Sequence, residues 1–187
     1  MTAGAAELTV HAPTGLLVGV RQVLSPHCDP RPCDVDLVIL HGISLPPGDF
    51  GGPAIEQLFS GNLSPDGHPY FATISTLRVS AHVLVRRDGE VVQFVPFGAR
   101  AWHAGVSSFE GRGGCNDFSV GIELEGTDDG PYTDAQYGRA VALVRALCRA
   151  YPAVTPARVV GHSDVAPGRK TDPGEAFDWR RLRALLA

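Results

Sequence analysis

Short apolar runs recur along the chain, and each is bounded by glycine, proline or polar residues. Runs of this kind, rich in valine, isoleucine and leucine, predict buried strands. Apart from a hairpin, they are residues 36–41, 118–125 and 157–162. The second run alternates, so that Ile122 and Leu124 share one face of the expected strand while Glu123 and Glu125 share the other. One face of this strand is therefore apolar and the other acidic.

Residues 80–95 predict a β-hairpin. Valines alternate with other residues on both sides of Asp88-Gly89. An Asp-Gly pair between two alternating segments is a strong hairpin signal, because glycine adopts the positive φ that a tight turn requires. We expect two antiparallel strands joined at this pair.

Three segments have the patterns of helices. The longest, Thr133–Ala150, repeats apolar residues at helical spacing, and a glutamine stands three residues after Thr133, as in a capping box. Shorter helices are expected at Pro53–Phe59 and at residues 178–186, where Asp178 is the expected N-cap.

Strands and helices are interleaved, and loops rich in proline or glycine are expected at residues 44–52 and 64–70. This order predicts an α/β (α+β) fold with a single domain, in which helices flank a mixed central β-sheet. A length of 187 residues also suits one domain. Residues 1–20 are expected to be a loose N-terminal leader, and residues 21–187 the domain.

Composition and charge exclude several classes of function. The formal net charge of −4 provides no basic field for DNA or RNA, and no apolar run approaches the roughly 20 residues that span a membrane. Residues 1–20 lack the pattern of a secretory signal, so we expect a cytoplasmic protein. We also expect the protein to be a monomer. The scattered cysteines Cys28, Cys33, Cys115 and Cys148 are expected to be free thiols.

One loop, residues 161–174, combines an imidazole, a lysine and a carboxylate between glycines and prolines. His162 in this loop and the distant His41 both end short apolar runs, where side chains point toward the crevice in which sheet proteins bind ligands. Two imidazoles with a carboxylate such as Asp172 form the donor set of a catalytic zinc site. Ordinary buried or surface histidines give the same pattern, and spacing alone does not separate the two interpretations.

Acid-base groups are also available. Glu123 or Glu125 is a candidate base for taking a proton from water, and Lys170 is a candidate donor to an oxyanion. A solvated strand face and a surface lysine would have the same sequence pattern, so both interpretations stay open.

Three further residues are candidates for binding a substrate. Trp102 is suited to stacking on a sugar or peptide, and Arg78 and Arg112 to anchoring carboxylates. A core tryptophan and solvated charges are the alternatives, and His82 in the expected hairpin is interpreted as a structural histidine. The sequence contains no GxGxxG, Walker, GxSxG or HExxH motif.

Several segments in collinear order carry a resemblance to a known family. They are Val38–His41, Ile43–Gly48, Phe50–Pro53, His68–Phe71, Leu77–His82, Arg86–Glu90, Arg100–Ser108, Cys115–Ser119, Gly121–Asp128 and Lys170–Gly174. In these segments, which together span roughly residues 20–186, the chain resembles the AmpD-type N-acetylmuramyl-L-alanine amidases. These bacterial enzymes trim anhydromuramyl peptides in peptidoglycan recycling.

The resemblance implies a zinc amidase with a peptidoglycan-recognition-like fold. It implies Zn²⁺ as cofactor, held by His41, His162 and Asp172, with Glu123 rather than Glu125 as the general base and Lys170 as the group that stabilises the oxyanion. The implied reaction is hydrolysis of the amide between the lactyl group of (1,6-anhydro)-N-acetylmuramic acid and L-alanine. The implied partner is a small muropeptide with a tri-, tetra- or pentapeptide stem.

The resemblance also implies that Trp102 lines the groove and that Arg78 faces peptide carboxylates. Family members often carry a basic residue directly before the Cys-Asn-Asp motif, where this chain has Gly113 and Gly114. Whether Arg112 replaces that residue is left open.

Two other functions compete with this interpretation. One is a related domain that binds peptidoglycan without cutting it, against which the complete set of metal and catalytic residues argues. The other is a broad amidase that acts on intact wall outside the cytoplasm, against which the missing signal pattern argues.

Overall fold

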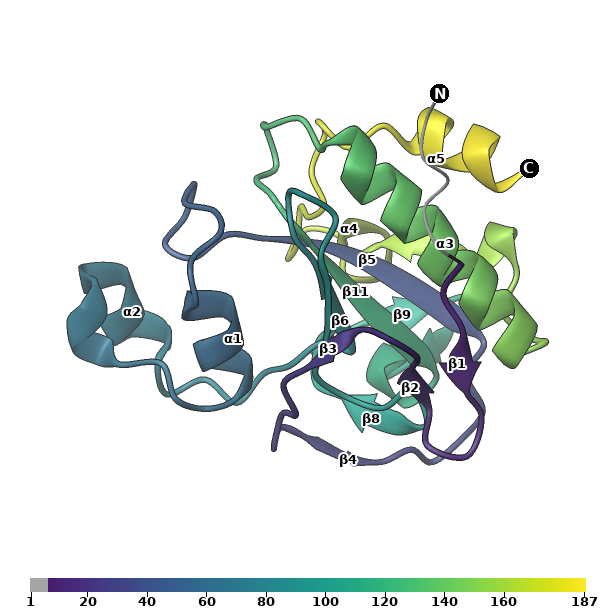
Figure 1. Ribbon diagram of the computed structural model, residues 1–187, viewed down its shortest axis with the longest axis horizontal. Helices are drawn as coiled ribbons and strands as arrows, with labels where there is room; N and C mark the ends of the chain where they lie inside the picture. Colours follow the sequence, from purple (N-terminus) through teal and green to yellow (C-terminus); the bar gives the residue numbers. More distant parts are fainter. Residues whose placement is uncertain (1–6) are drawn as a thin grey trace.

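A six-stranded mixed sheet forms the centre of the computed structural model, which describes residues 7–187 (Figure 1). Its strands in spatial order are β12 (Val159–Gly161), β5 (Leu37–Ile43), β11 (Ser119–Glu125), β6 (Val83–Val85), β7 (Val91–Gln93) and β3 (Arg21–Gln22). Neighbouring strands are parallel except for β6 and β7, which form the predicted antiparallel hairpin. The prediction of one domain with a mixed sheet is confirmed.

Helices cover both faces of this sheet (Figure 1). On one face the core joins the apolar side of β5 and β11 to α3 (Asp134–Ala150) and α5 (Trp179–Leu186). A second core cluster lies between α1 (Ala54–Phe59) and the β6–β7 hairpin. In β11, Ile122 and Leu124 belong to the α3 side, so the alternation read from the sequence places Glu123 and Glu125 on the opposite face.

The predicted helix caps are present. The Thr133 hydroxyl accepts a hydrogen bond from the backbone N–H of Gln136 at 3.2 Å, and the Gln136 side chain accepts one from the N–H of Thr133 at 3.0 Å. Asp178 caps α5 by accepting from the N–H of Arg181 at 2.8 Å. These bonds satisfy N–H groups that a helix start otherwise leaves unpaired.

Short elements complete the fold. Pairs of antiparallel strands are β1 (Val10–His11) with β2 (Leu16–Leu17), β4 (Cys28–Pro30) with β8 (Ala99–Ala101), and β9 (Ser108–Phe109) with β10 (Arg112–Gly113). Short helices are η1 (Pro65–Gly67), α2 (Pro69–Ile74), η2 (Cys115–Asp117), η3 (Pro156–Arg158) and α4 (His162–Val165). The loop expected at residues 64–70 is therefore wrong in part, because it contains η1 and the start of α2. The side chains of Ser64 and His68 cap these helices.

The expected loose leader is wrong for residues 8–20. Leu8 and Leu17 are buried in the core beside α3. The N–H of Leu17 donates to Gln93 Oε1 at 2.6 Å, and Arg149 donates to the carbonyl of Leu8 at 2.9 Å. Apolar side chains and backbone bonds thus attach this segment, and the domain begins before residue 21. Residues 1–6 of the expected leader lie outside the described residues.

Two other expectations concern membranes and disulfides. None of the helices within residues 7–187 combines the length and the hydropathy of a membrane span. All four cysteines lie in the described part of the chain and are unpaired, as predicted.

Candidate active site and metal centre

Three parallel strands bring the candidate residues to one edge of the sheet. β5 lies between β12 and β11, and Glu123 of β11 is the register partner of His41. Gly161, the last residue of β12, pairs with Leu40, so that His162 follows beside His41. Because parallel strands share one carboxyl edge, these residues meet although they lie far apart in the sequence.

The strand ends differ slightly from the prediction. β5 continues to Ile43, two residues beyond His41, and β12 stops at Gly161, so that His162 is the first residue of α4 rather than the last of a strand. His41 therefore points from within a strand, while His162 points from the start of a helix.

Three potential ligand atoms lie together at this edge. His41 Nδ1 is 3.0 Å from His162 Nδ1 and 3.2 Å from Asp172 Oδ2, and the latter two atoms are 3.1 Å apart. Two ligands bound tetrahedrally to zinc at about 2.1 Å are separated by roughly 3.4 Å. The three atoms are thus spaced like ligands on one face of a tetrahedron, and they form a group that could hold a metal ion.

The protonation of the cluster also suits a metal ion. His162 Nε2 lies 3.1 Å from the carbonyl oxygen of Ala104, which only accepts, so Nε2 carries a proton and Nδ1 is the ring nitrogen left to face the cluster. Burial lowers the pKa of His41 to about 4, so this imidazole is neutral at pH 7. Lone pairs that face each other at these distances are satisfied by a cation, and the donor set fits Zn²⁺.

Asp172 supplies the negative charge of the cluster. A carboxylate here balances the charge of a divalent cation that the two imidazoles would share with it. Its backbone is fixed by the N–H of Ser163, which donates to the carbonyl of Asp172 at 3.0 Å. The carboxylate is therefore held in place beside the two imidazoles, as a metal ligand must be.

Glu123 lies beside this cluster and is almost fully buried. Its Oε2 atom is buried and has no hydrogen-bond partner within the described residues. Burial, followed by the nearby Asp172, raises the pKa of Glu123 well above its usual value. A carboxylate with a raised pKa is suited to accepting a proton and returning it near neutral pH.

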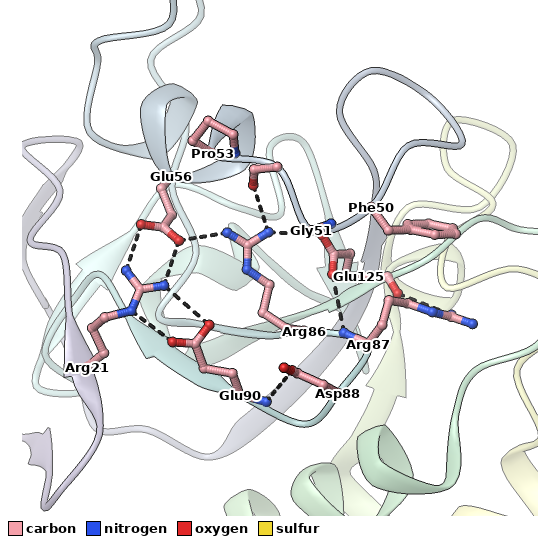
Figure 2. A pocket seen from close by; sticks show the side chains of 11 residues that line it. Arg21, Phe50, Gly51, Pro53, Glu56, Arg86, Arg87, Asp88, Glu90 and Glu125 are labelled. Atoms are coloured by element: carbon pink, nitrogen blue, oxygen red, sulfur yellow. Dashed lines mark hydrogen bonds and ion pairs between the residues drawn. The ribbon is translucent and has the colours of Figure 1, made fainter.

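Glu125 is used differently, although it shares a strand face with Glu123. Its Oε1 atom accepts from Arg86 Nη1 at 2.9 Å and from the N–H of Gly51 at 2.7 Å, and its Oε2 accepts from the N–H of Arg87 at 3.2 Å. Figure 2 shows this carboxylate within a separate ion-pair network that also includes Glu56. The geometry thus separates two glutamates that the sequence pattern left equivalent.

One groove of about 530 Å³ joins the metal cluster to the other candidates. His41, His162, Asp172, Glu123 and Lys170 all line it. Its apolar lining includes Leu58, Phe59, Tyr70, Ile74, Leu77 and Trp102. The groove therefore places polar chemistry next to an apolar surface.

Of the three candidate binding residues, only Trp102 lines the groove. Arg78 is exposed between two lining residues, Leu77 and Val79. The structure does not bring Arg112 to the groove: its guanidinium pairs with Asp36 at 2.5 Å and lies over the ring of Phe118 at 3.6 Å. The suggestion that Arg112 contacts substrate is not supported by this placement.

Two further histidines lie next to the metal cluster, and one of them, His103, also lines the groove. His82 Nδ1 accepts from the N–H of Gly121 at 2.9 Å, in agreement with its predicted structural role. His103 was assigned no role, yet its Nδ1 lies 2.9 Å from His41 Nε2. Burial lowers the pKa of His103 well below its usual value, so the ring is neutral. No local pattern signals this contact, because the two residues are 62 positions apart in the sequence.

Comparisons with known proteins agree with this geometry. A sequence model of the family described as N-acetylmuramoyl-L-alanine amidase matches residues 31–175. The chain belongs to this amidase family. The amidase is 60% identical over 175 residues to the 1,6-anhydro-N-acetylmuramyl-L-alanine amidase AmpD of Escherichia coli K12, covering 92% of this chain and 95% of that protein.

Solved structures extend the comparison. A crystal structure of a selenomethionine derivative of AmpD matches the amidase with a TM-score of 0.90 at 58% identity, covering 93% of this chain and 98% of that chain. A complex of the E. coli amidase AmiD with the substrate anhydro-N-acetylmuramic acid-L-Ala-D-γ-Glu-L-Lys matches with a TM-score of 0.59 at 27% identity. The match covers 86% of this chain and 58% of that chain. The resemblance and the fold class inferred from the sequence are confirmed.

Proposed function

We propose that the amidase hydrolyses the bond between the lactyl group of 1,6-anhydro-N-acetylmuramic acid and the L-alanine of a stem peptide, with Zn²⁺ as its metal. The observation that carries this proposal is the cluster of His41, His162 and Asp172 beside the buried Glu123 in one groove. The 60% identity to AmpD supports the anhydromuramyl substrate.

Each side chain has a distinct part in this reaction. When bound to the three ligands, Zn²⁺ lowers the pKa of water and polarises a carbonyl oxygen. Glu123 accepts the proton of the attacking water and passes it to the departing amine of L-alanine, for which its raised pKa is suited. Lys170, an exposed cation at the groove, donates to the oxyanion that forms on the lactyl carbonyl.

The groove suits a substrate with both apolar and charged parts. Trp102 and its apolar neighbours provide a surface on which a sugar ring or the peptide stem packs. Arg78, at the rim, is the candidate partner for a stem-peptide carboxylate. The 60% identity to AmpD favours a small muropeptide over an intact wall polymer as the substrate class, and recycling in the cytoplasm is the corresponding cellular role.

Cleavage of a defined substrate tests the proposal. Purified protein is incubated with anhydromuramyl tripeptide, with and without a chelator, and the free peptide is measured by mass spectrometry. We expect cleavage that the chelator abolishes and added zinc restores. Zinc binding without any cleavage would instead indicate a domain that binds muropeptides only.

Substrate preference and location test the finer part of the proposal. We expect a faster rate on anhydromuramyl than on ordinary muramyl peptide, measured side by side at equal concentration. Cell fractionation should recover the protein with cytoplasmic markers; recovery outside the cytoplasm would contradict the recycling role.

A further inference from the structure

His103 lies directly behind one of the metal ligands. Its Nδ1 is 2.9 Å from His41 Nε2, the ring nitrogen that faces away from the metal cluster. The two rings meet edge to face, with centroids 5.0 Å apart. On its other side, His103 Nε2 lies 3.3 Å from the hydroxyl of the buried Ser119.

The direction of these hydrogen bonds follows from the last acceptor in the series, which is the backbone carbonyl of Cys115. The Ser119 hydroxyl donates its one proton to the carbonyl of Cys115 at 2.6 Å. His103 must then donate from Nε2 to Ser119, and an imidazole with its proton on Nε2 offers Nδ1 as an acceptor. His41 therefore donates from Nε2 to His103, and its own Nδ1 is a free lone pair directed at the cluster.

The backbone of His103 is fixed as well. Asn116 Oδ1 accepts from the N–H of His103 at 3.1 Å and from the N–H of Ala104 at 2.7 Å. Ala104 is also the residue whose carbonyl accepts from His162 Nε2 at 3.1 Å. One short segment thus carries the outer partners of both ligand histidines.

The strand beneath His103 leaves space for its ring. A Cβ atom at Gly121 would lie 2.5 Å from Cγ and 2.6 Å from Nδ1 of His103, distances that real contacts do not tolerate. Gly121 stands between Ser119 and Glu123 on the same face of β11, so only a residue without a side chain admits the imidazole there.

We propose that His103 is a positioning residue for the metal centre, which holds His41 in the tautomer and ring orientation that present Nδ1 to the metal. The inference rests on the proposed metal site. Outer hydrogen bonds of this kind raise the basicity of a ligand imidazole and prevent its rotation, and their loss typically weakens metal binding about 10- to 100-fold.

Zinc affinity of matched variants tests this role. Zinc is titrated at neutral pH against a chromophoric chelator into the wild type, His103→Leu and His103→Asn. We expect His103→Leu to bind zinc about 10- to 100-fold more weakly. His103→Asn should bind near the wild-type affinity, because its amide oxygen reaches the position of Nδ1 and accepts from His41. Equal losses in both variants, or no loss in His103→Leu, would overturn the inference.

A second variant removes no polar group. Gly121→Ala should displace the His103 ring and weaken zinc binding as His103→Leu does, whereas substitution of the exposed His11 by leucine should leave it unchanged. Unchanged affinity in Gly121→Ala would count against the proposed contact. Chemical denaturation of the zinc-free variants reports any general loss of stability separately.

Nitrogen NMR of the zinc-free protein reads the tautomer of His41 directly. We expect a larger share of His41 with its proton on Nε2 in the wild type and in His103→Asn than in His103→Leu; an equal share in all three proteins would overturn the inference. The outcome is separable from that of the proposed function. Muropeptide cleavage together with unchanged zinc affinity in His103→Leu contradicts only the role of His103, and zinc binding without cleavage in the wild type contradicts only the function.

Discussion

Arg86 lies at the centre of the ion-pair network in Figure 2, and replacing it by methionine is expected to destabilise the fold. Its Nη1 donates to Glu125 Oε1 and to the carbonyl of Gly52, both at 2.9 Å, and its Nη2 donates to Glu56 Oε1 at 2.6 Å. The side chain of Glu125 is only 1% exposed, so Arg86→Met leaves a buried carboxylate without its counter-ion.

The size of the expected loss in unfolding free energy depends on the hydrogen bonds that Glu125 retains in the variant. Breaking a buried ion pair by removing one partner costs about 3–5 kcal/mol. In Arg86→Met, Glu125 still accepts from the N–H of Gly51 at 2.7 Å and of Arg87 at 3.2 Å, so we expect the lower end, about 3 kcal/mol. With an m-value of about 2 kcal/mol/M, the urea midpoint falls by about 1.5 M.

Urea unfolding followed by circular dichroism at neutral pH measures this loss. Arg181→Met is the matched control, because its partner Asp134 is 91% exposed and such pairs contribute less than about 1 kcal/mol. Adding Glu125→Gln to Arg86→Met should recover part of the stability, since no buried charge is then left unpaired. Equal losses for Arg86→Met and Arg181→Met, or a further loss in the double variant, would refute the reasoning.

Other predictions concern the metal, the base and acid stability. Glu123→Gln should retain zinc but lose about 10²- to 10⁴-fold in kcat on anhydromuramyl tripeptide, followed by mass spectrometry; an undiminished rate would exclude it as the base. His41→Ala should lose its metal, measured as zinc per chain, because one of three donors is removed; a full complement of zinc would point to other ligands. The hydrogen bond from Arg21, with that from Arg86, lowers the pKa of Glu56 from 4.5 to about 2. The stability that Glu56 contributes is therefore present above pH 4.5 and is lost as the pH falls from 4.5 to about 2. Glu56→Gln should flatten the decline of the urea midpoint over that range, and an unaltered decline would contradict the assignment.

Elements whose signals are local could be predicted from the sequence. The β6–β7 hairpin follows from one Asp-Gly pair, and the start of α3 from a capping box. The packing of residues 8–20 could not be predicted, because Leu8 and Leu17 are apolar residues in a stretch with little periodicity, and only the surface beside α3 decides that they are buried. The α2 helix was missed since its six residues begin at Pro69, in a segment that also contains Pro65 and is typical of turns.

The candidate site shows the same division. The donor types of His41, His162 and Asp172 suggested a metal centre, but their convergence depends on parallel pairing between distant strands. The roles of Glu123 and Glu125 differ because of what packs against each carboxylate, and no property of the strand itself separates them. Glu125 lies against Arg86 and Glu123 lies beside the metal cluster, and neither neighbour can be read from spacing in the sequence.

Because apolar and polar residues alternate along β11, the register of this strand in the sheet is either fully correct or wrong for every side chain. A slip of one residue would turn Glu123 and Ser119 into the apolar layer under α3 and would bring Ile122 to the groove. A carboxylate without a partner is strongly unfavourable in that layer, so molecules with a slipped β11 would not fold stably. The apolar face of β11, which does not contact the groove, therefore fixes the alignment of the face that carries Glu123. Substitutions on the apolar face should reduce the fraction of correctly folded molecules rather than the turnover rate of each folded molecule.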